Sequence, residues 1–505
     1  MSTAERFGLF VALALGVLVR LLPILGAAGP VGDGGLIFTM VEDLRASGLV
    51  IPATTSFSSL DIPFVYPPAA MLGAAAIGEA TGASTFELLR WLPLLLSVAG
   101  LGAFAWLAWR VLPPIAAVGA TFAFALMPHA YDWVIAGGGV TRGAGLLFAL
   151  LAMAVASRPG TWRWAPVAAG VLLGAALLSH PQAAIAGVIG CAVLSWGGEV
   201  RPWARNAAIA GAVAVAISLP WLIAVIATNG IGSLASPANR FEPLVGLIRM
   251  TNLRFSGAPF MDVAAVFGVV GVLVAVVRGP RRVPLFLLLV YLGGAGGGEF
   301  LAATPWALAC GIGIAALGEV ATPRDSSRRF RRYAAVAIGA VAIFLGLVGS
   351  LASGAEGSSK LHALSAGHHQ AMAWLASNTE ADATVLVPTA GVWGDDEVSE
   401  WLPALGHRHS IGTVQGSEWL GAEAFQARLG IHGRIRDCAG STVPCYAEID
   451  PDAILFIPKG QLGGPFSPGD CCPALRETVE AAGYRIAYDG PGATIAIPAR
   501  AQEED

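Results

Sequence analysis

The feature of this sequence that most constrains its fold is a series of long apolar stretches between residue 7 and residue 353. Only 13% of the 505 residues are charged, whereas 55% are hydrophobic. Soluble domains carry about 25% charged residues, and about 20 consecutive apolar residues are enough for a helix to cross a bilayer. The chain is therefore predicted to be a polytopic α-helical membrane protein.

About eleven of these stretches are predicted to span the membrane as helices. They are 7–26, 88–109, 113–128, 142–157, 164–180, 182–198, 206–228, 259–277, 283–294, 301–319 and 333–353. Arginines gather in every second connection, and basic connections stay in the cytoplasm. This pattern predicts an integral protein of the cell (plasma) membrane with a cytoplasmic N-terminus and an exoplasmic C-terminus. The first stretch is interpreted as a span rather than a cleaved signal peptide, because many further spans follow.

The apolar stretch 69–78 is short for a span and follows Pro67-Pro68. If it crossed the membrane, Arg110 would fall on the outer side, so it is expected to lie along the outer surface. The first outer loop then runs from 27 to 87. It belongs to a predicted transmembrane domain of residues 1–355.

Residues 356–505 are predicted to form an exoplasmic, soluble α/β domain, because short apolar strands alternate with helical segments there. Four cysteines in this part suggest disulfides and an oxidising compartment, and three connectivities are possible. A bond between the adjacent Cys471 and Cys472 would be strained. Each is therefore expected to pair with Cys438 or Cys445, with a zinc site as the alternative.

Asp33 is the first acidic residue after the first predicted span. Its carboxylate is predicted to be catalytic. The alternative is that Asp33 caps the helix expected to begin at Gly34, because aspartate is a favoured N-cap residue.

The 129–141 loop carries a second acid, Asp132, between Tyr131 and Trp133. Glycines at its end let the backbone approach an anion, and Arg142 follows them at an expected helix start, where it could bind a phosphate. The loop is therefore a candidate part of the same site, with an interfacial aromatic belt as the alternative.

Further polar residues lie at predicted outer ends of spans, where apolar packing does not require them. His180 is a candidate, although a lone histidine at such a turn more often ends a helix. Arg240 and Arg254 lie outside against the positive-inside pattern and could bind an anionic ligand. Glu299 would be costly if it faced lipid, so it is expected to face a cavity.

Acids and arginines at one membrane surface suit a phosphorylated substrate. The three carboxylates are predicted to hold Mg²⁺ or Mn²⁺, which prefer hard oxygen ligands and could neutralise a departing phosphate. The predicted metal ligands are Asp33, Asp132 and Glu299, and the predicted phosphate-binding residues are Arg142, Arg240 and Arg254. A net charge of −4 argues against a nucleic-acid partner.

Several of these features together resemble the GT-C fold of membrane glycosyltransferases, which use polyprenyl-linked sugars. The shared features are an acid soon after the first span, Tyr66-Pro67-Pro68 before the second, and a polar second outer loop. The resemblance implies that Asp33 and Asp132 are the acids of the first two loops and that Glu299 is an acid of the fifth.

The C-terminal part departs from one branch of that fold, the oligosaccharyltransferases. These carry Trp-Trp-Asp-Tyr-Gly after a strand, whereas the corresponding place here reads Val392-Trp393-Gly394-Asp395-Asp396. Trp393 and Asp395 therefore stay candidate site residues, but the motif does not imply an acceptor peptide. Asp395 is also expected to cap a helix that runs to Leu405.

The sequence thus predicts an inverting glycosyltransferase that moves a sugar from a polyprenyl-phosphate or polyprenyl-diphosphate donor to an exoplasmic acceptor. The acceptor would be a glycan, a lipid or a protein of the cell envelope, and membrane lipid would surround the spans. One alternative is a transporter or flippase of lipid-linked glycans. The other is a non-catalytic membrane scaffold that displays the C-terminal domain.

Overall fold

The structure is a computed structural model that describes residues 2–25, 34–157, 162–234, 263–293, 299–320, 328–361, 364–459 and 472–499. Asp33, Arg240 and Arg254 lie outside these ranges. Glu299 and Asp395 are placed within helices, but their side chains lie outside the description.

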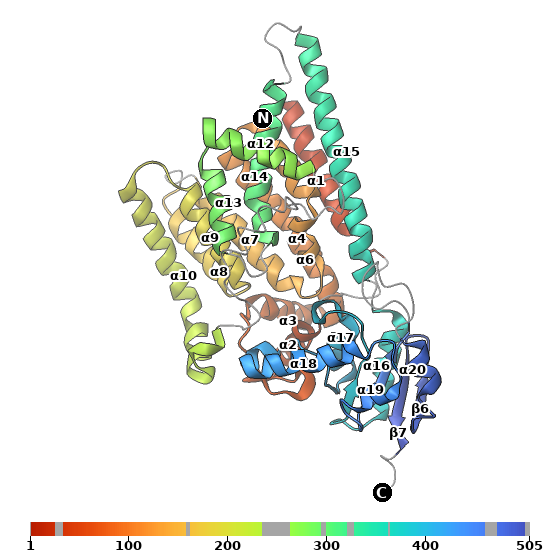
Figure 1. Ribbon diagram of the computed structural model, residues 1–505. Coiled ribbons are helices and arrows are strands. Elements are labelled where there is room, and N and C mark those ends of the chain that lie inside the picture. Colours follow the sequence, from red (N-terminus) through yellow and green to blue (C-terminus); the bar gives the residue numbers. More distant parts are fainter. Residues whose placement is uncertain are drawn as a thin grey trace.

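A bundle of long helices makes up most of the described chain (Figure 1). Its helices are α1 (Thr3–Leu21), α4 (Thr85–Val111), α5 (Pro114–Leu126), α7 (Gly139–Ala156), α8 (Ala165–Leu177), α9 (Pro181–Leu194), α10 (Val200–Asn229), α12 (Val263–Arg278), α13 (Arg282–Gly293), α14 (Glu299–Val320) and α15 (Arg328–Leu361). In the interior, α14 packs against α5 and α12, and α7 packs against α4 and α8. Small residues let these helices approach closely, as is typical of helix packing in membranes.

Among the described residues, four helices are long and apolar enough to cross a membrane on their own, namely α4, α7, α10 and α14. A fifth candidate combines α5 with the short helices that follow it, at a bend of 86°. Several other bundle helices are apolar but shorter, with 10–17 residues. Helices coincide with all eleven stretches expected to span, but the number of spans and their orientation stay predictions.

Two short helices, α2 (Gly35–Ala46) and α3 (Ala69–Thr81), lie at one end of this bundle (Figure 1). They pack against each other, and a two-stranded ribbon of β1 (Thr54–Thr55) and β2 (Ile62–Pro63) lies in the segment that joins them. The apolar stretch 69–78, expected to lie along the outer surface, falls within α3. This helix is 13 residues long and lies between the bundle and the C-terminal elements.

The C-terminal elements surround a five-stranded sheet with the strand order β4-β3-β5-β7-β6. Its strands are β3 (Thr384–Leu386), β4 (His409–Ser410), β5 (Ile454–Pro458), β6 (Tyr484–Asp489) and β7 (Ala493–Pro498). β3 runs parallel to β4 and β5, whereas β7 is antiparallel to β5 and β6. The helices are α16 (Ala366–Asn378), α17 (Glu397–Gly406), α18 (Ala422–Asp437), α19 (Val443–Ala447) and α20 (Pro473–Thr478).

This part thus combines helices and strands as expected. Every residue of β5 is buried, and the sheet has an apolar core. The division into two domains and the solubility of the second stay predictions. The last bundle helix, α15, runs without a break past residue 355 to Leu361.

The expected disulfide pairing is wrong. Cys438 is bonded to Cys445, with their Cα atoms 5.8 Å apart. Cys438 ends α18 and Cys445 lies in α19, so the tight turn between these helices brings both within the usual Cα separation of about 4.4–6.8 Å. Cys472 is disulfide-bonded as well, and Cys471 lies outside the described residues.

Candidate functional site

Three distant parts of the chain meet at the start of α2. Gly34 is the N-cap residue of α2, and a Cβ atom on it would lie 2.6 Å from Cζ2 of Trp401 and 3.3 Å from Cα of Gly137. Trp401 belongs to α17 and is fully buried, whereas Gly137 belongs to the 129–141 loop. The first residue after Asp33 therefore touches both the second predicted outer loop and the C-terminal elements.

The start of α2 also bears on the alternative role of Asp33. Gly34, not Asp33, occupies the N-cap position, and α2 begins one residue later than expected, at Gly35. A Cβ atom on Gly35 would lie only 2.6 Å from the carbonyl oxygen of Glu400 in α17. Glycine is thus required there because the two backbones are in contact.

The 129–141 loop begins at a sharp bend after α5. Pro128 has no N–H group and restricts the residue before it to extended conformations, and Met127 has φ −87° and ψ 112°. The chain then forms two short helices, η2 (Pro128–Ala130) and α6 (Asp132–Ile135), and turns by 86°. This bend carries Tyr131 and Asp132 to the end of the bundle that faces α2.

The bend leaves the last carbonyl groups of α5 without partners inside the helix. Arg20 of α1 donates hydrogen bonds to two of them. Its guanidinium donates to the carbonyl oxygen of Ala125 at 2.8 Å and to that of Phe124 at 3.3 Å. It also donates to Ser97 Oγ at 3.0 Å and to the carbonyl oxygen of Gly16 at 2.9 Å. Arg20 is completely buried, so these acceptors replace the water that a charged group would otherwise require.

Arg20 also links this bend to the candidate acid. Its Cζ atom lies 4.6 Å from the centre of the Tyr131 ring, which is fully buried. Asp132 follows as the first residue of α6, and its carboxylate Oδ2 accepts a hydrogen bond of 3.0 Å from Ser353 Oγ of α15. A second serine of α15, Ser350, donates to the carbonyl oxygen of Leu126. Asp132 is thus bonded to α15 and follows the ring over which Arg20 of α1 lies.

Sequence reasoning missed Arg20, Ser97, Ser350 and Ser353 as parts of this network. Ser350 and Ser353 are three residues apart in a predicted span, a spacing that places both on one face of a helix. That spacing could have indicated that the two serines contact the same neighbour. Ser97 gave no such indication, because a single hydroxyl group inside an apolar helix can bond to the backbone of its own helix.

Arg142, a predicted phosphate-binding residue, lies at the other end of the same loop. Its Nε donates to the carbonyl oxygen of Trp133 at 2.8 Å, and its Cζ lies 5.0 Å from the centre of the Trp133 ring. Trp133 itself is half exposed. The contact with Trp133 fixes the guanidinium of Arg142 beside the loop that carries Asp132. Asp132, Trp133 and Arg142 therefore lie in one part of the structure.

Two further candidates lie in other elements of the chain. His180 is the N-cap residue of α9, where its Nδ1 accepts from the N–H of Ala183 at 3.3 Å and its ring packs on Phe300. Trp393 is half buried in a short helix and packs edge-on against Phe425.

The expected helix cap in the C-terminal part is displaced by one residue. Asp396, not Asp395, is the N-cap of α17, and its side chain accepts from the N–H of Ser399. Asp395 ends the preceding short helix. The reason is that α17 begins at Glu397, so Asp396 directly precedes the helix and its side chain reaches the N–H group of the third helical residue.

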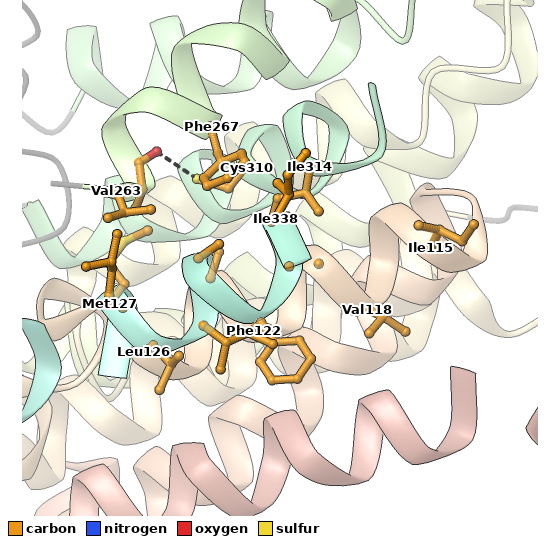
Figure 2. Close-up of a pocket in the computed structure, with 18 of the residues that line it drawn as sticks. Ile115, Val118, Phe122, Leu126, Met127, Val263, Phe267, Cys310, Ile314 and Ile338 are labelled. Carbon is orange, nitrogen blue, oxygen red and sulfur yellow. Dashed lines mark hydrogen bonds between the residues drawn. The ribbon is translucent and has the colours of Figure 1, made fainter. Parts of the chain in front are cut away.

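An apolar cavity of about 350 Å³ lies beside the bend (Figure 2). It is lined by α5, α12, α14, α15 and the start of α1, and apart from Glu5 its side chains are apolar or weakly polar, with Cys310 Sγ bonded to a backbone carbonyl. It follows α5 from Ile115 to Leu126, which is about 16 Å at 1.5 Å per residue. One end of it therefore reaches Met127, the residue before the bend.

Solved structures share this architecture. An archaeal oligosaccharyltransferase, AglB from Archaeoglobus fulgidus in complex with an inhibitory peptide and a dolichol-phosphate, is 14% identical, with a TM-score of 0.58 over 90% of this chain and 69% of that chain. The same enzyme tethered with an acceptor peptide gives a TM-score of 0.60, with 14% identity over 91% and 69% of the two chains. ArnT from Cupriavidus metallidurans bound to undecaprenyl phosphate gives 0.58, with 14% identity over 96% and 97%.

Comparisons of sequence alone give no further relative, since neither a protein-family model nor a curated protein matches the chain. The structural likeness spans almost the whole chain and nearly the whole of ArnT. The chain therefore has the fold of these polyprenyl-phosphate-dependent membrane glycosyltransferases, the GT-C fold.

Proposed function

We propose that the chain is an inverting membrane glycosyltransferase that moves a sugar from a polyprenyl-phosphate or polyprenyl-diphosphate donor to an exoplasmic acceptor. The observation that supports this most is the convergence at Gly34. The residue that follows Asp33 touches the loop that carries Asp132 and the C-terminal helix α17. A donor held at the membrane and an acceptor held by the C-terminal elements could meet there.

In the proposed reaction, an oxygen of the acceptor attacks the anomeric carbon of the donor sugar. The new glycosidic bond forms as the bond from that carbon to the phosphate oxygen breaks, and polyprenyl phosphate or diphosphate leaves. Asp33 takes the proton of the attacking hydroxyl group, as a general base does. Attack on the face opposite the leaving group inverts the configuration.

The described residues would serve the donor. Arg142 would face the phosphate, because a guanidinium pairs well with phosphate oxygens and the Trp133 ring holds it beside the loop. The apolar cavity that ends at Met127 would hold part of the polyprenyl tail, since each buried CH₂ group contributes about 0.8 kcal/mol. Arg240 and Arg254 remain candidates for the same phosphate.

A divalent cation, Mg²⁺ or Mn²⁺, would neutralise charge on the leaving phosphate when bound. Its proposed ligands are Asp33, Asp132 and Glu299, of which only Asp132 has a described side chain. Within the described ranges, no group of three or more His, Cys, Asp or Glu side chains could hold a metal. The metal site therefore depends on Asp33 and Glu299, and no step of the proposed reaction runs through it.

Replacement of Asp33 by asparagine tests the proposal. The full chain in lipid nanodiscs would be given polyprenyl-phosphate pentoses and hexoses with envelope glycans as acceptors. We expect Asp33→Asn to lower transfer by about 10²–10⁴-fold, the usual contribution of a general base. Asp61→Asn is the matched control, since Asp61 is exposed in the same predicted loop and has a positive φ of 49°, which asparagine tolerates.

Full turnover by Asp33→Asn would remove the central claim. If the wild-type protein moved the lipid-linked sugar between leaflets of a vesicle and formed no glycosidic product, the flippase alternative would replace it.

A further inference from the structure

Two hollows flank α2 on the side away from the bundle core, and together we call them the α2 groove. One, of about 600 Å³, is bounded by α2, by Glu79 of α3 and by residues 84–86 at the start of α4. The other, of about 400 Å³, lies between α2, Ser56 and Ser58, and the end of α17 with the two residues that follow it, His407 and Arg408. Phe38 and Glu42 line both hollows. Each volume is within the range of small-molecule sites.

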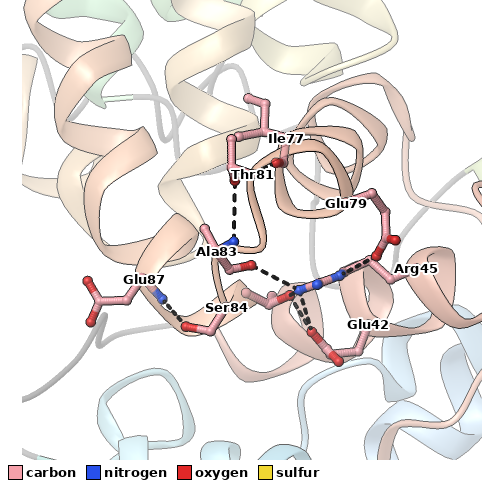
Figure 3. Close-up of polar contacts among 9 residues, drawn as sticks. Glu42, Arg45, Ile77, Glu79, Thr81, Ala83, Ser84 and Glu87 are labelled. Atoms are coloured by element: carbon pink, nitrogen blue, oxygen red, sulfur yellow. Dashed lines mark hydrogen bonds and ion pairs between the residues drawn. The ribbon is translucent and has the colours of Figure 1, made fainter.

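The charges of the groove favour a neutral ligand, because Arg408 in the second hollow is buried and already bonded to Thr379 and to backbone carbonyls, and the first hollow carries two acids. Arg45 donates to Glu79 at 2.9 Å and to Thr85 Oγ1 at 3.1 Å, and it lies 3.5 Å from Glu42 (Figure 3). Its side chain is 22% exposed, whereas those of Glu42 and Glu79 are 47% and 53% exposed. The only arginine in the first hollow is thus paired with two acids whose side chains are about half exposed, and Glu42 Oε1 also accepts a hydrogen bond from Thr85. Such a lining repels phosphate and accepts hydrogen bonds from hydroxyl groups.

Aromatic rings complete the lining. Phe38 lies 5.8 Å from the ring of the buried Trp401, and Phe86 lies 6.1 Å from the same ring. These contacts hold both phenyl rings in place at the edge of the groove. The hydrogen-bearing face of a sugar ring packs against the negative face of an aromatic ring, while carboxylates and hydroxyl groups bind its hydroxyls.

We propose that the α2 groove binds the acceptor and that the acceptor is a neutral, polyhydroxylated glycan. Glu42 accepts hydrogen bonds from its hydroxyl groups, and Phe38 packs against a sugar ring. The claim that the bound glycan is the acceptor rests on the proposed function. The claim that the groove binds a glycan does not. Glu42 stands seven residues after Gly35, about 10 Å along the helix axis, so the groove holds sugar units beyond the one that reacts next to the start of α2.

The test compares two glutamates that have similar exposure and a similar arginine neighbour, of which only one lines the groove. Glu42 and Glu87 are 47% and 50% exposed, and each has an arginine three residues further along its helix. Figure 3 shows the Glu87 side chain directed away from the Arg45 cluster. Glu42→Gln is the test variant and Glu87→Gln its control. Phe38→Leu is a second test variant that keeps apolar volume and removes the ring.

The purified full-length protein would be applied to an array of neutral mannose, glucose, galactose and arabinose oligosaccharides, with acidic glycans and peptides alongside. We expect the wild type, Glu87→Gln and the inactive Asp33→Asn to bind neutral oligosaccharides equally. Glu42→Gln should bind about tenfold or more weakly, the effect of losing a hydrogen bond to a charged group. In the transfer assay, Glu42→Gln should raise KM for the acceptor with little change in kcat.

Equal binding by Glu42→Gln and the wild type would overturn the proposal, as would binding only to acidic glycans or peptides, or no binding at all. These outcomes leave the proposed function intact. Full turnover by Asp33→Asn together with normal oligosaccharide binding would instead remove the proposed function and keep the groove as a glycan-binding surface.

Discussion

The contact between α2 and α17 makes Gly35→Ala a severe substitution. The added Cβ atom would lie 2.6 Å from the Glu400 carbonyl oxygen, 3.2 Å from its carbon and 3.4 Å from Cα of Trp401. All three are backbone atoms, so no side chain can rotate away. Because ordinary contact begins at 3.4 Å, the two backbones would have to separate by about 0.8 Å.

This separation sets the expected magnitudes. Overpacking of this kind costs about 1–3 kcal/mol, and alanine in place of helical glycine recovers only about 0.5–1 kcal/mol. We expect a net loss of stability of about 1–2 kcal/mol. A displacement of about 1 Å near a reacting centre can lower the rate about 10²-fold, so transfer should fall by one to two orders of magnitude.

Thermal unfolding followed by tryptophan fluorescence measures the first effect, and the transfer assay measures the second. Gly73→Ala in α3 is the control, because no atom lies within 4 Å of its added Cβ. That variant should be neutral or slightly stabilising. If Gly35→Ala matched the wild type in both stability and turnover, α17 would not be in contact with the start of α2.

Two further predictions concern buried titratable groups. Arg20→Met removes hydrogen bonds to Ser97 and to three backbone carbonyls. Because hydrogen bonds to charged groups contribute about 1.5–3 kcal/mol each, the free energy of unfolding should fall by at least about 3 kcal/mol. An Arg20→Met variant as stable as the wild type would contradict the network. Burial lowers the pKa of His368 and of His369, which packs on α4, below the ordinary 6.5. The unfolded chain therefore takes up protons that the folded protein resists, and the free energy of unfolding should fall as the pH is lowered below 6.5. The variant His368→Gln, His369→Phe should show a shallower fall in pH-dependent melting, though not a flat one, because burial lowers the pKa of His409 as well; an unchanged slope would refute this.

Local sequence patterns were enough to place the helices and most strands. Apolar length located helices at all the stretches expected to span, and short apolar runs indicated strands in the C-terminal part, where β3, β5, β6 and β7 lie. Local patterns also singled out Asp132, Trp133 and Arg142, which the structure brings together in one loop. These features can be predicted from the sequence because each depends on residues that are close together in the chain.

Features that depend on distant residues could not be predicted in this way. Arg20 bonds to residues 77 and 105 positions away, and Ser353 bonds to Asp132 across 221 positions. The contact of Gly35 with Glu400 joins the first predicted outer loop to the C-terminal elements. The disulfide was missed for the opposite reason, since a turn between α18 and α19 that was not foreseen brought two nearby cysteines together.

The position of Asp132 follows from a single break in α5. Pro128 ends the helix and so frees the carbonyl groups of the residues before it. Arg20 and Ser350 bond to three successive carbonyls, and the positive charge of Arg20 also suits a helix C-terminus.

The two helices that bond to the freed carbonyl groups, α1 and α15, also reach Tyr131 and Asp132 just after the break. α1 places the Arg20 guanidinium over the ring next to Asp132, and α15 donates a hydroxyl group to its carboxylate. A buried arginine is costly to desolvate, so a chain that needed only a stable bundle would gain by continuing α5 without a break. The break therefore fixes where Asp132 lies, and Arg20 links α1 to the end of α5 and to the ring next to that acid.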